Sequence, residues 1–260
     1  MRYGFVGAGN MCSAIINGMP ADEIYVYDIC KEKCEALGAK VRICSGNDEV
    51  IANADILILG IKPNMLQTFF EAHKAALLKH KPLLVSLAAG KPISFLENCI
   101  GEPMSLVRVM PNINSICLAS TTGYCCNALV NMEQKKQIEE LFGNIGTIIE
   151  IADESKFPVF TALAGSSPAF CYMYIDSLAR AGQKAGLSRE ESLQIAAETV
   201  LGSAKMILAS EEHPFALIDR VCSPGGTTIE GISVLQKESF EAIINSAIEA
   251  VIAKDKKLSQ

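Results

Sequence analysis

Short apolar runs alternate with segments of helical period through the first half of the chain. The run 56–59 contains only apolar residues, which predicts a strand with both faces buried. Strands that alternate with helices predict a parallel sheet with helices on both faces. The other strands are expected at 3–6, 24–27, 41–43, 83–86 and 105–109, and the helices between them at 11–19, 31–37 and 65–78.

The pattern changes beyond the middle of the chain. The last strand candidates lie at 116–124 and 147–151, around a helix at 133–142. Ser188 and Glu191 have the spacing of a capping box, which marks a helix start. Further helices are expected at 169–185, from Ser188 onward and at 239–254. We therefore predict an α/β fold in which residues 1–152 form a Rossmann-type, doubly wound parallel sheet and residues 153–260 form an all-helical domain.

Charge and composition narrow the possible partners. The 260 residues carry a formal charge of −6, which disfavours nucleic acid and anionic membrane surfaces because both attract basic patches. The uncharged runs 109–132 and 157–175 are interrupted by proline and polar residues, so neither offers the roughly 20 apolar residues of a membrane-spanning helix. Apolar residues are in excess in the C-terminal half, which favours an oligomer interface over a well-filled core.

The cysteines predict neither a metal site nor a disulfide framework. None of the ten cysteines forms a C-x-x-C pair, and with only three histidines the spacing of zinc ligands is missing. We recognise no secretory leader before the first strand. We therefore expect reduced thiols in a cytoplasmic protein.

A glycine-rich turn follows the first strand. Gly7 permits a tight turn, and Gly9 lets a pyrophosphate approach the N–H groups at the start of the next helix. Cys12 stands where a third glycine is usual, so helix–strand packing is expected to be slightly looser. The strand, turn, helix and strand order favours a dinucleotide site over an ordinary glycine turn.

Asp28 ends the second strand and bears on the choice of cofactor. An acid there accepts hydrogen bonds from the ribose hydroxyls of NAD and repels the 2′-phosphate of NADP. Lys31 and Lys33 lie close by and could offset that repulsion. Asp28 could also cap the following helix. The sequence leaves NADH and NADPH open.

Turns after later strands are expected to line the same crevice, because ligands of such sheets bind beyond the carboxyl ends of strands. Ile61, Lys62 and Pro63 form a stiffened turn after the strand 56–59. Ala88 supplies a small side chain where a nicotinamide ring could lie flat. The segment Met110-Pro-Asn112 follows the strand 105–109.

A second glycine-rich turn lies in the helical half. Ser223, Gly226, Thr227 and Thr228 offer backbone N–H groups and hydroxyls with little side-chain obstruction. Such an arrangement at a helix start predicts a carboxylate receptor that needs no positive charge. The segment Gly165-Ser-Ser-Pro168 has the residues of another helix start, where capping alone would explain them.

These motifs carry a family resemblance over essentially the whole chain. The chain resembles pyrroline-5-carboxylate reductase, the last enzyme of proline biosynthesis, in these segments: Phe5-Val-Gly-Ala-Gly-Asn-Met, Ile61-Lys-Pro, Leu87-Ala-Ala-Gly, Val109-Met-Pro-Asn, Gly165-Ser-Ser-Pro-Ala, Gly202-Ser-Ala-Lys-Met, Glu212-His-Pro and Val221-Cys-Ser-Pro-Gly-Gly-Thr-Thr-Ile-Glu.

The resemblance implies roles for individual residues. It assigns the pyrophosphate to Val6, Gly7, Ala8, Gly9, Asn10 and Met11. It assigns the rest of the cofactor to Asn47, Ile61, Lys62, Pro63 and Ala88, in addition to Asp28. It assigns the substrate, a cyclic imino acid, to Glu154, Val221, Ser223, Gly226, Thr227 and Thr228. It also implies a homodimer in which the helical domain of one chain completes the active site of the other, with decamers as a further assembly.

The implied reaction is hydride transfer from NADPH or NADH to the C5 imine carbon of 1-pyrroline-5-carboxylate, giving L-proline. A protonated imine is already electrophilic, so the protein contributes mainly proximity. We expect the Thr228 hydroxyl to hydrogen-bond the ring nitrogen. Two alternatives stay open: a β-hydroxyacid dehydrogenase, which would use a lysine such as Lys184 or Lys205, and a non-catalytic dinucleotide sensor.

Overall fold

The computed structural model describes residues 1–20 and 23–258. The chain divides into two compact units. The first comprises residues 1–165 together with the chain from Val251 onward, and the second comprises Ser166–Ala250.

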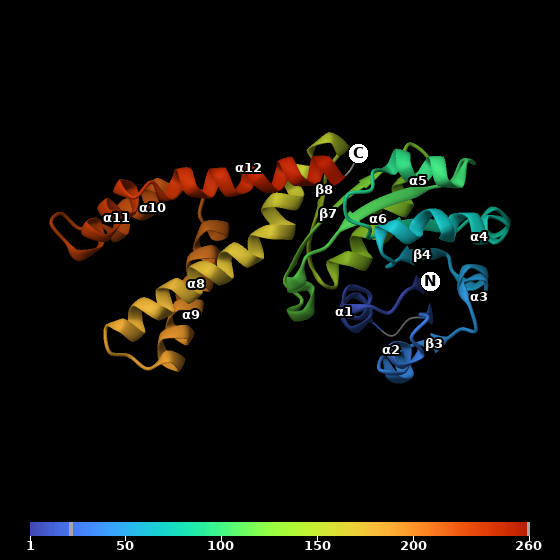
Figure 1. Ribbon diagram of the computed structural model, residues 1–260, viewed down its shortest axis with the longest axis horizontal. Coiled ribbons are helices and arrows are strands. Elements are labelled where there is room, and N and C mark those ends of the chain that lie inside the picture. Colours follow the sequence, from blue (N-terminus) through green and yellow to red (C-terminus); the bar gives the residue numbers. More distant parts are fainter. Residues whose placement is uncertain (21–22, 259–260) are drawn as a thin grey trace. The chain divides into compact units, whose positions relative to one another are not determined.

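The first unit is built around an eight-stranded sheet (Figure 1). Its strands are β1 Arg2–Val6, β2 Glu23–Tyr27, β3 Arg42–Ile43, β4 Ile56–Leu59, β5 Leu83–Ser86, β6 Leu106–Met110, β7 Ser120–Cys126 and β8 Gly146–Glu150. They lie in the order β3-β2-β1-β4-β5-β6-β7-β8. The chain therefore adds β2 and β3 on one side of β1, and it adds β4 and the later strands on the other side. The order in which strands are added reverses between β1 and β4. Such a reversal opens a crevice at the carboxyl ends of the two strands.

One strand pair departs from the predicted parallel arrangement. β6 and β7 are antiparallel, with Val109 opposite Tyr124, so the prediction was wrong at this pair. The connection between the two strands contains only the 3₁₀-helix η3 Ile113–Cys117. A parallel connection needs a crossover of about a dozen residues or more, which this segment does not provide. The other neighbouring strands are parallel, as expected.

Helices cover both faces of the sheet and enclose two apolar cores. The helices are α1 Asn10–Gly18, α2 Lys31–Glu35, α3 Asn47–Asn53, α4 Leu66–His80, α5 Ile93–Ile100 and α6 Met132–Gly143. Side chains of α1, α2 and α6 belong to one core, and side chains of α3, α4 and α5 to the other (Figure 1). Along β4, Ile56 and Ile58 face the first core while Leu57 and Leu59 face the second. The predicted burial of both strand faces and the Rossmann-type fold class are confirmed.

The hydrophobic pattern does not predict α3 or α5. α3 has 7 residues and α5 has 8, so neither contains enough apolar repeats to establish a helical period. Asn47, the first residue of α3, lines a cavity at this crevice, and Phe95 of α5 lines a second cavity. The two unpredicted helices are therefore among the elements that shape the candidate site.

The first unit extends past the predicted domain boundary. Residues 153–165 belong to it, and the second unit begins at Ser166. This stretch holds the 3₁₀-helix η4 Glu154–Lys156, α7 Phe157–Phe160 and the π-helix η5 Thr161–Ser166. Phe157 is fully buried in the core beneath α3, α4 and α5, which explains why the segment packs with the sheet rather than with the helices that follow.

The second unit consists of helices. They are α8 Ser167–Lys184, α9 Arg189–Ala209, α10 Pro214–Val221, α11 Thr227–Lys237 and the first part of α12 Phe240–Leu258. The predicted capping box starts α9: Ser188 Oγ accepts the Glu191 N–H, and the Glu191 carboxylate accepts the Ser188 N–H. Asp176 of α8 pairs with Arg180 and with Arg189 of α9, which joins these two helices.

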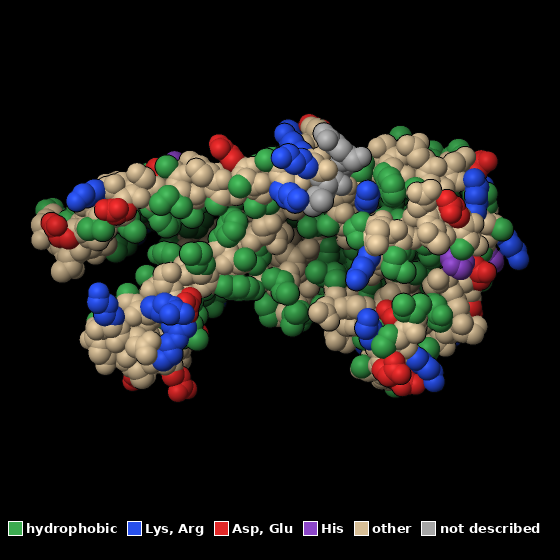
Figure 2. All heavy atoms as spheres, viewed as in Figure 1, with side chains coloured by type: hydrophobic (Ala, Val, Ile, Leu, Met, Phe, Trp, Pro, Cys, Tyr) green, Lys and Arg blue, Asp and Glu red, His purple; other side chains and the backbone are tan. Residues whose placement is uncertain are grey.

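Most large apolar side chains of the second unit are exposed (Figure 2). Leu208 on α9 is 87% exposed. Among the described residues of α10 and α11, none is buried. Apolar patches of this extent mark an interaction surface, in agreement with the interface expected from the composition. None of the helices within residues 1–20 and 23–258 is long and apolar enough to cross a membrane.

Candidate active site

The glycine turn after β1 has the geometry that the sequence predicts. Gly7 has a φ of +100°, and its N–H donates to the Tyr27 carbonyl at 2.8 Å. A Cβ on Gly7 would lie 2.9 Å from the Gly60 carbonyl oxygen, so both the conformation and the space require glycine. A Cβ on Gly9 would meet nothing within 4 Å. The space above Gly9 is therefore open for a ligand.

Asp28 anchors this turn. Its Oδ2 accepts the Ala8 N–H at 2.8 Å, and its Oδ1 accepts the Cys30 N–H at 2.8 Å. The carboxylate thus ties the end of β2 to the turn after β1. The residue that caps α2 is Cys30, without a side-chain hydrogen bond, so the alternative of Asp28 as the helix cap was wrong. Two backbone donors satisfy part of its charge and weaken its repulsion of a phosphate.

Cys12 fits its position because Gly60 lies opposite. A Cβ on Gly60 would lie only 2.0 Å from Cys12 Sγ. Cys12 is fully buried, and burial raises the pKa of its thiol to about 12. The side chain is therefore an apolar filler between α1 and β4, and no extra space remains around it. All ten cysteines are free thiols.

A cavity of about 690 Å³ lies at the crevice between β1 and β4. Its walls come from the turns after β1, β2 and β4, from the start of α3 and from one side of α4. Its lining residues are Val6, Gly7, Gly9, Tyr27, Asp28, Ile29, Lys33, Asn47, Gly60, Ile61, Lys62, Asn64, Met65, Thr68, Phe69, Ala72 and His73. A volume of this size suits a small organic cofactor.

The structure brings together many of the predicted cofactor residues and separates a few. The predicted residues that line this cavity are Val6, Gly7, Gly9, Asp28, Asn47, Ile61 and Lys62. Ala8 contributes its N–H to Asp28 instead. Asn10 begins α1, and the Met11 sulfur accepts the Ser115 hydroxyl at 3.5 Å. Ala88 is buried in the second core.

Sequence reasoning missed the wall that α4 provides. Thr68, Phe69, Ala72 and His73 line the cavity at the spacing of one helix face. Their mixture of polar, aromatic and small side chains resembles an ordinary half-buried helix. The proximity of the helix to the turn Ile61-Lys-Pro63 was the one signal in the sequence that pointed to it.

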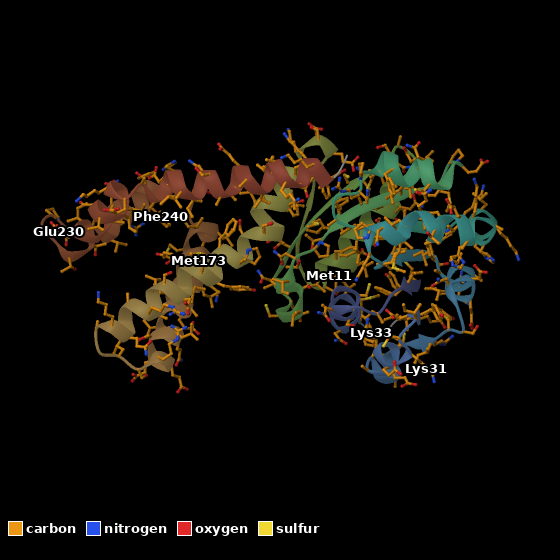
Figure 3. All side chains as sticks on the ribbon, viewed as in Figure 1. Met11, Lys31, Lys33, Met173, Glu230 and Phe240 are labelled. Atoms are coloured by element: carbon orange, nitrogen blue, oxygen red, sulfur yellow. The ribbon has the colours of Figure 1, made fainter. Side chains whose placement is uncertain are left out.

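The lysines near Asp28 differ in their surroundings (Figure 3). Lys31 pairs with Glu35 at 3.0 Å on the surface of α2. Lys33 lines the cavity, and no carboxylate of the described residues lies within ion-pair distance of it. Of these two cations, Lys33 is the one placed to meet a phosphate.

A second cavity of about 490 Å³ lies beside the first. It is lined by Pro63, Asn64, Gln67, Ala89, Gly90, Lys91, Phe95 and Asp255. The Lys91 ammonium lies 4.6 Å from the centre of the Phe95 ring. Pro63, predicted for the cofactor, therefore faces this cavity together with the loop that follows β5.

The predicted crevice residues after β6 are fastened to the π-helix η5. Asn112 is buried, and its Nδ2 donates to the Ala164 carbonyl at 3.0 Å. Its Oδ1 accepts the Asn114 N–H, and its own N–H donates to Ser120 Oγ. A Cβ on Gly165 would lie 3.0 Å from the terminal methyl of Met110. π-Helical turns are frequent at functional sites, where they redirect a helix.

Glu154 lies in the first unit and is held by two donors. Its Oε1 accepts the Ile93 N–H at 2.9 Å and Arg108 Nη1 at 3.0 Å. The Arg108 guanidinium is almost fully buried and stacks 4.1 Å from the centre of the Phe157 ring. The ion pair fixes Glu154 and links β6 to the start of α5.

The other predicted substrate residues lie together in the second unit. Val221 ends α10, and Thr227 and Thr228 begin α11, whose N-cap is Gly226. The Gly226 N–H donates to the Ser223 carbonyl at 3.0 Å, which closes the turn. No side chain caps α11. Its first N–H groups and the positive end of the helix dipole remain available for an anion.

A dinucleotide-type crevice in a Rossmann sheet, followed by a helical unit with an anion-binding turn, defines a nicotinamide-dependent oxidoreductase. Comparisons with known proteins agree. Residues 2–90 match the family model described as NADP oxidoreductase, coenzyme F420-dependent. Residues 154–258 match the model described as pyrroline-5-carboxylate reductase dimerisation, which begins close to the predicted domain boundary. The chain belongs to the pyrroline-5-carboxylate reductase family.

The similarity spans both units. The pyrroline-5-carboxylate reductase of Escherichia coli is 36% identical over 100% of this chain and 98% of its own length. The pyrroline carboxylate reductase of Plasmodium falciparum, solved with NADP bound, is 32% identical over 100% of this chain and 98% of that chain, with a TM-score of 0.90. The Coxiella burnetii enzyme is 31% identical over the same shares, with a TM-score of 0.93.

Proposed function

We propose that this chain reduces 1-pyrroline-5-carboxylate to L-proline with NADPH or NADH, by hydride transfer to the C5 imine carbon. The observation that carries the proposal is the pairing of two anion-receptive helix starts in one chain. One lies at α1, beside the open space above Gly9. The other lies at α11, where no side chain caps the helix.

The residues of the first unit fit a dinucleotide. Gly7 has no room for a Cβ, while the space above Gly9 is open, so the backbone of the turn can approach a pyrophosphate. Val6, Asn47, Ile61 and Lys62 would hold the remainder, with Ala8, Asn10, Met11, Pro63 and Ala88 supporting the crevice from behind or beside it. A reduced nicotinamide bound there supplies the hydride.

The turn before α11 would receive the substrate carboxylate. The N–H groups of Thr227 and Thr228 lie in the first turn of the helix, where the dipole favours an anion. Val221 and Ser223 would contact the ring from the start of the turn. The Thr228 hydroxyl would donate to or accept from the ring nitrogen and so select the imine face. An uncharged receptor avoids repulsion of the protonated imine.

Glu154 would contact the substrate from the first unit. Its fixed carboxylate, held through Oε1 by Ile93 and Arg108, is a preorganised acceptor. A carboxylate that orients a cationic imine needs a fixed position, and Glu154 has one. The match to a dimerisation family indicates that the chain associates with itself.

The exposed helices support a more specific proposal for the assembly. We infer a homodimer in which the helical unit of one copy completes the site on the first unit of the other, and decamers built from such dimers. The apolar side chains of α8 to α12 would be covered in that interface. The location of the working enzyme is taken to be the cytoplasm, where its free thiols stay reduced.

Steady-state reduction of 1-pyrroline-5-carboxylate, with NADH and NADPH assayed in parallel, tests the proposal. The expected result is turnover with at least one of the two, and none when a β-hydroxyacid is offered with the oxidised cofactors. Oxidation of the hydroxyacid alone would favour the dehydrogenase alternative. Dinucleotide binding without any turnover would favour the alternative of a non-catalytic dinucleotide sensor.

A further inference from the structure

A chain of three side chains lies at the ribose end of the cofactor cavity. His73 Nδ1 lies 2.7 Å from Asp48 Oδ1, and His73 Nε2 lies 3.2 Å from Asn47 Nδ2. Asn47 and His73 both line the cavity. Tyr27 and Asp28, which follow β2, line the same cavity. In Rossmann folds this is where the adenosine ribose of a dinucleotide lies.

The proton on the imidazole follows from these distances. A carboxylate only accepts hydrogen bonds, so Nδ1 of His73 must carry the proton that faces Asp48. In the neutral ring, Nε2 is then an acceptor and receives the Asn47 amide N–H. The ring packs against Phe69, with the centroids 4.9 Å apart, which restricts its rotation. Asp48 therefore excludes the other neutral tautomer.

The direction of the Asn47 amide is set by the same bond. With Nδ2 turned toward His73, the amide oxygen Oδ1 is buried and has no hydrogen-bond partner among the described residues. A buried acceptor without a donor is unfavourable. A ribose hydroxyl of a bound cofactor would supply that donor.

Protonation of His73 reverses this arrangement. A charged imidazole donates from both nitrogens, so Nε2–H requires Oδ1 of Asn47 as its acceptor and the amide must turn over. Nδ2 then replaces Oδ1 at the ribose side. An N–H donor favours a 2′-phosphate, whereas an acceptor favours a 2′-hydroxyl.

We propose that His73 is a positioning residue for cofactor selection: through Asn47 it determines whether the cavity prefers the 2′-hydroxyl of NADH or the 2′-phosphate of NADPH. The inference rests on the proposed use of a nicotinamide dinucleotide. The neutral ring favours NADH, and the charged ring favours NADPH. Falling pH therefore shifts the preference toward NADPH.

Other charged groups near His73 leave this sign unchanged. On α3, Asp48 contacts His73 directly, while Glu49 is occupied by the Ser45 N–H and hydroxyl. The remaining charged residues that line the cavity are Asp28, Lys33 and Lys62. Asp28 is held by two backbone donors, and the two lysines are the same in every variant of the test.

The test is calorimetric binding of NAD⁺ and NADP⁺ to the whole protein over a series of falling pH values. The ratio Kd(NAD⁺)/Kd(NADP⁺) of the wild type is expected to rise on acidification by about ten-fold relative to the ratio of His73→Leu, the size of one charge-assisted hydrogen bond. The 2′-phosphate also takes up a proton, which lowers its charge and opposes the rise in both proteins. The effect of His73 is therefore the difference between the wild-type profile and the His73→Leu profile.

Two further variants make the test specific. His80→Leu removes an exposed histidine from the end of the same helix, outside the cavity, and should keep the full pH dependence. Asp48→Asn admits the second neutral tautomer, so it should raise the preference for NADP⁺ already at the higher pH. A His73→Leu protein with the wild-type pH profile would overturn the inference. If neither nucleotide bound, the result would instead contradict the proposed function itself.

Discussion

The two units of this chain bury their apolar residues to very different degrees. The first encloses two filled cores on the faces of one sheet, whereas the second leaves residues as large as Leu208 and Phe215 exposed. The ligand sites differ in the same way. The first unit forms a cavity of about 690 Å³ from its own elements. The second offers the start of α11, which no side chain caps.

This difference teaches that the two halves depend on association to different extents. A sheet with helices on both faces satisfies its own hydrophobic surface. A helical unit with exposed apolar faces needs another surface to cover them. We therefore expect the first unit to bind dinucleotide without a partner, and the second to form a working substrate site only after self-association.

The largest effect is expected when the apolar surface of the second unit receives a charge. Ile243 on α12 is 61% exposed. In a dimer, Ile243→Glu would bury an unpaired carboxylate, so association should be lost and turnover should fall by more than about a hundred-fold, a cost of several kcal/mol. Light scattering coupled to gel filtration would give the mass. Met132→Glu, at a 79% exposed apolar residue of the first unit, is the matched control. An Ile243→Glu protein that stays assembled would refute this surface as the interface.

Removal of the Thr228 hydroxyl should affect the substrate and spare the cofactor. One lost hydrogen bond to the reacting ring costs about 1.5–3 kcal/mol, so kcat/KM for the imine should fall by about 10–100-fold in Thr228→Ala. Dinucleotide affinity should stay unchanged, because the residue belongs to the second unit. Steady-state kinetics and calorimetry measure the two effects separately. Unchanged kcat and KM would show that the hydroxyl has no role.

Packing at the glycine turn should couple two residues of the first unit. Gly60→Ala would bring a methyl group within 2.0 Å of Cys12 Sγ, which should destabilise folding by about 1–3 kcal/mol. Cys12→Ala removes the sulfur, so the double variant should recover much of this loss. Denaturant unfolding of the two single variants and the double variant forms a double-mutant cycle. Strictly additive losses would mean that the two side chains do not meet.

The smallest effect concerns a surface ion pair of the sheet. Hydrogen bonding and charge from Arg2, whose Nη2 lies 2.6 Å from Asp55 Oδ1, hold the pKa of the Asp55 carboxyl below its ordinary value. A depressed folded-state pKa contributes stability above the unfolded value of about 3.9, and this is lost as pH falls through the folded one. Because Asp55 is 44% exposed, the contribution should be under about 1 kcal/mol. Thermal unfolding of Asp55→Asn and wild type should converge at low pH, and a constant gap would contradict this sign.

Sequence patterns were informative where local chemistry decides the structure. The buried run 56–59 and the glycines of the turn after β1 demand one backbone arrangement, and the capping box at Ser188 acts within a single helix turn. The family motifs predicted the function, because they occur in both units.

Features that depend on pairing distant segments could not be predicted in the same way. Asp28 was expected to face a ribose or to cap a helix, but its bond to Ala8 exists only because β2 lies beside β1. The antiparallel β7 depends on a connection too short for a crossover. His73 meets Asn47 and Asp48 only because α4 packs against α3. Each case requires tertiary geometry that one sequence does not encode locally.

The central claim is that the two units of different copies make one active site, and mixing two inactive variants tests it most directly. Gly9→Asp and Thr228→Asp each place an acid in a helix first turn or cap, which the helix tolerates but an anionic ligand does not. Each protein alone should be inactive. Co-expressed, random dimers should regain about a quarter of wild-type turnover, because half of them contain one site with two intact units. No recovery in demonstrated mixed dimers would contradict the shared site.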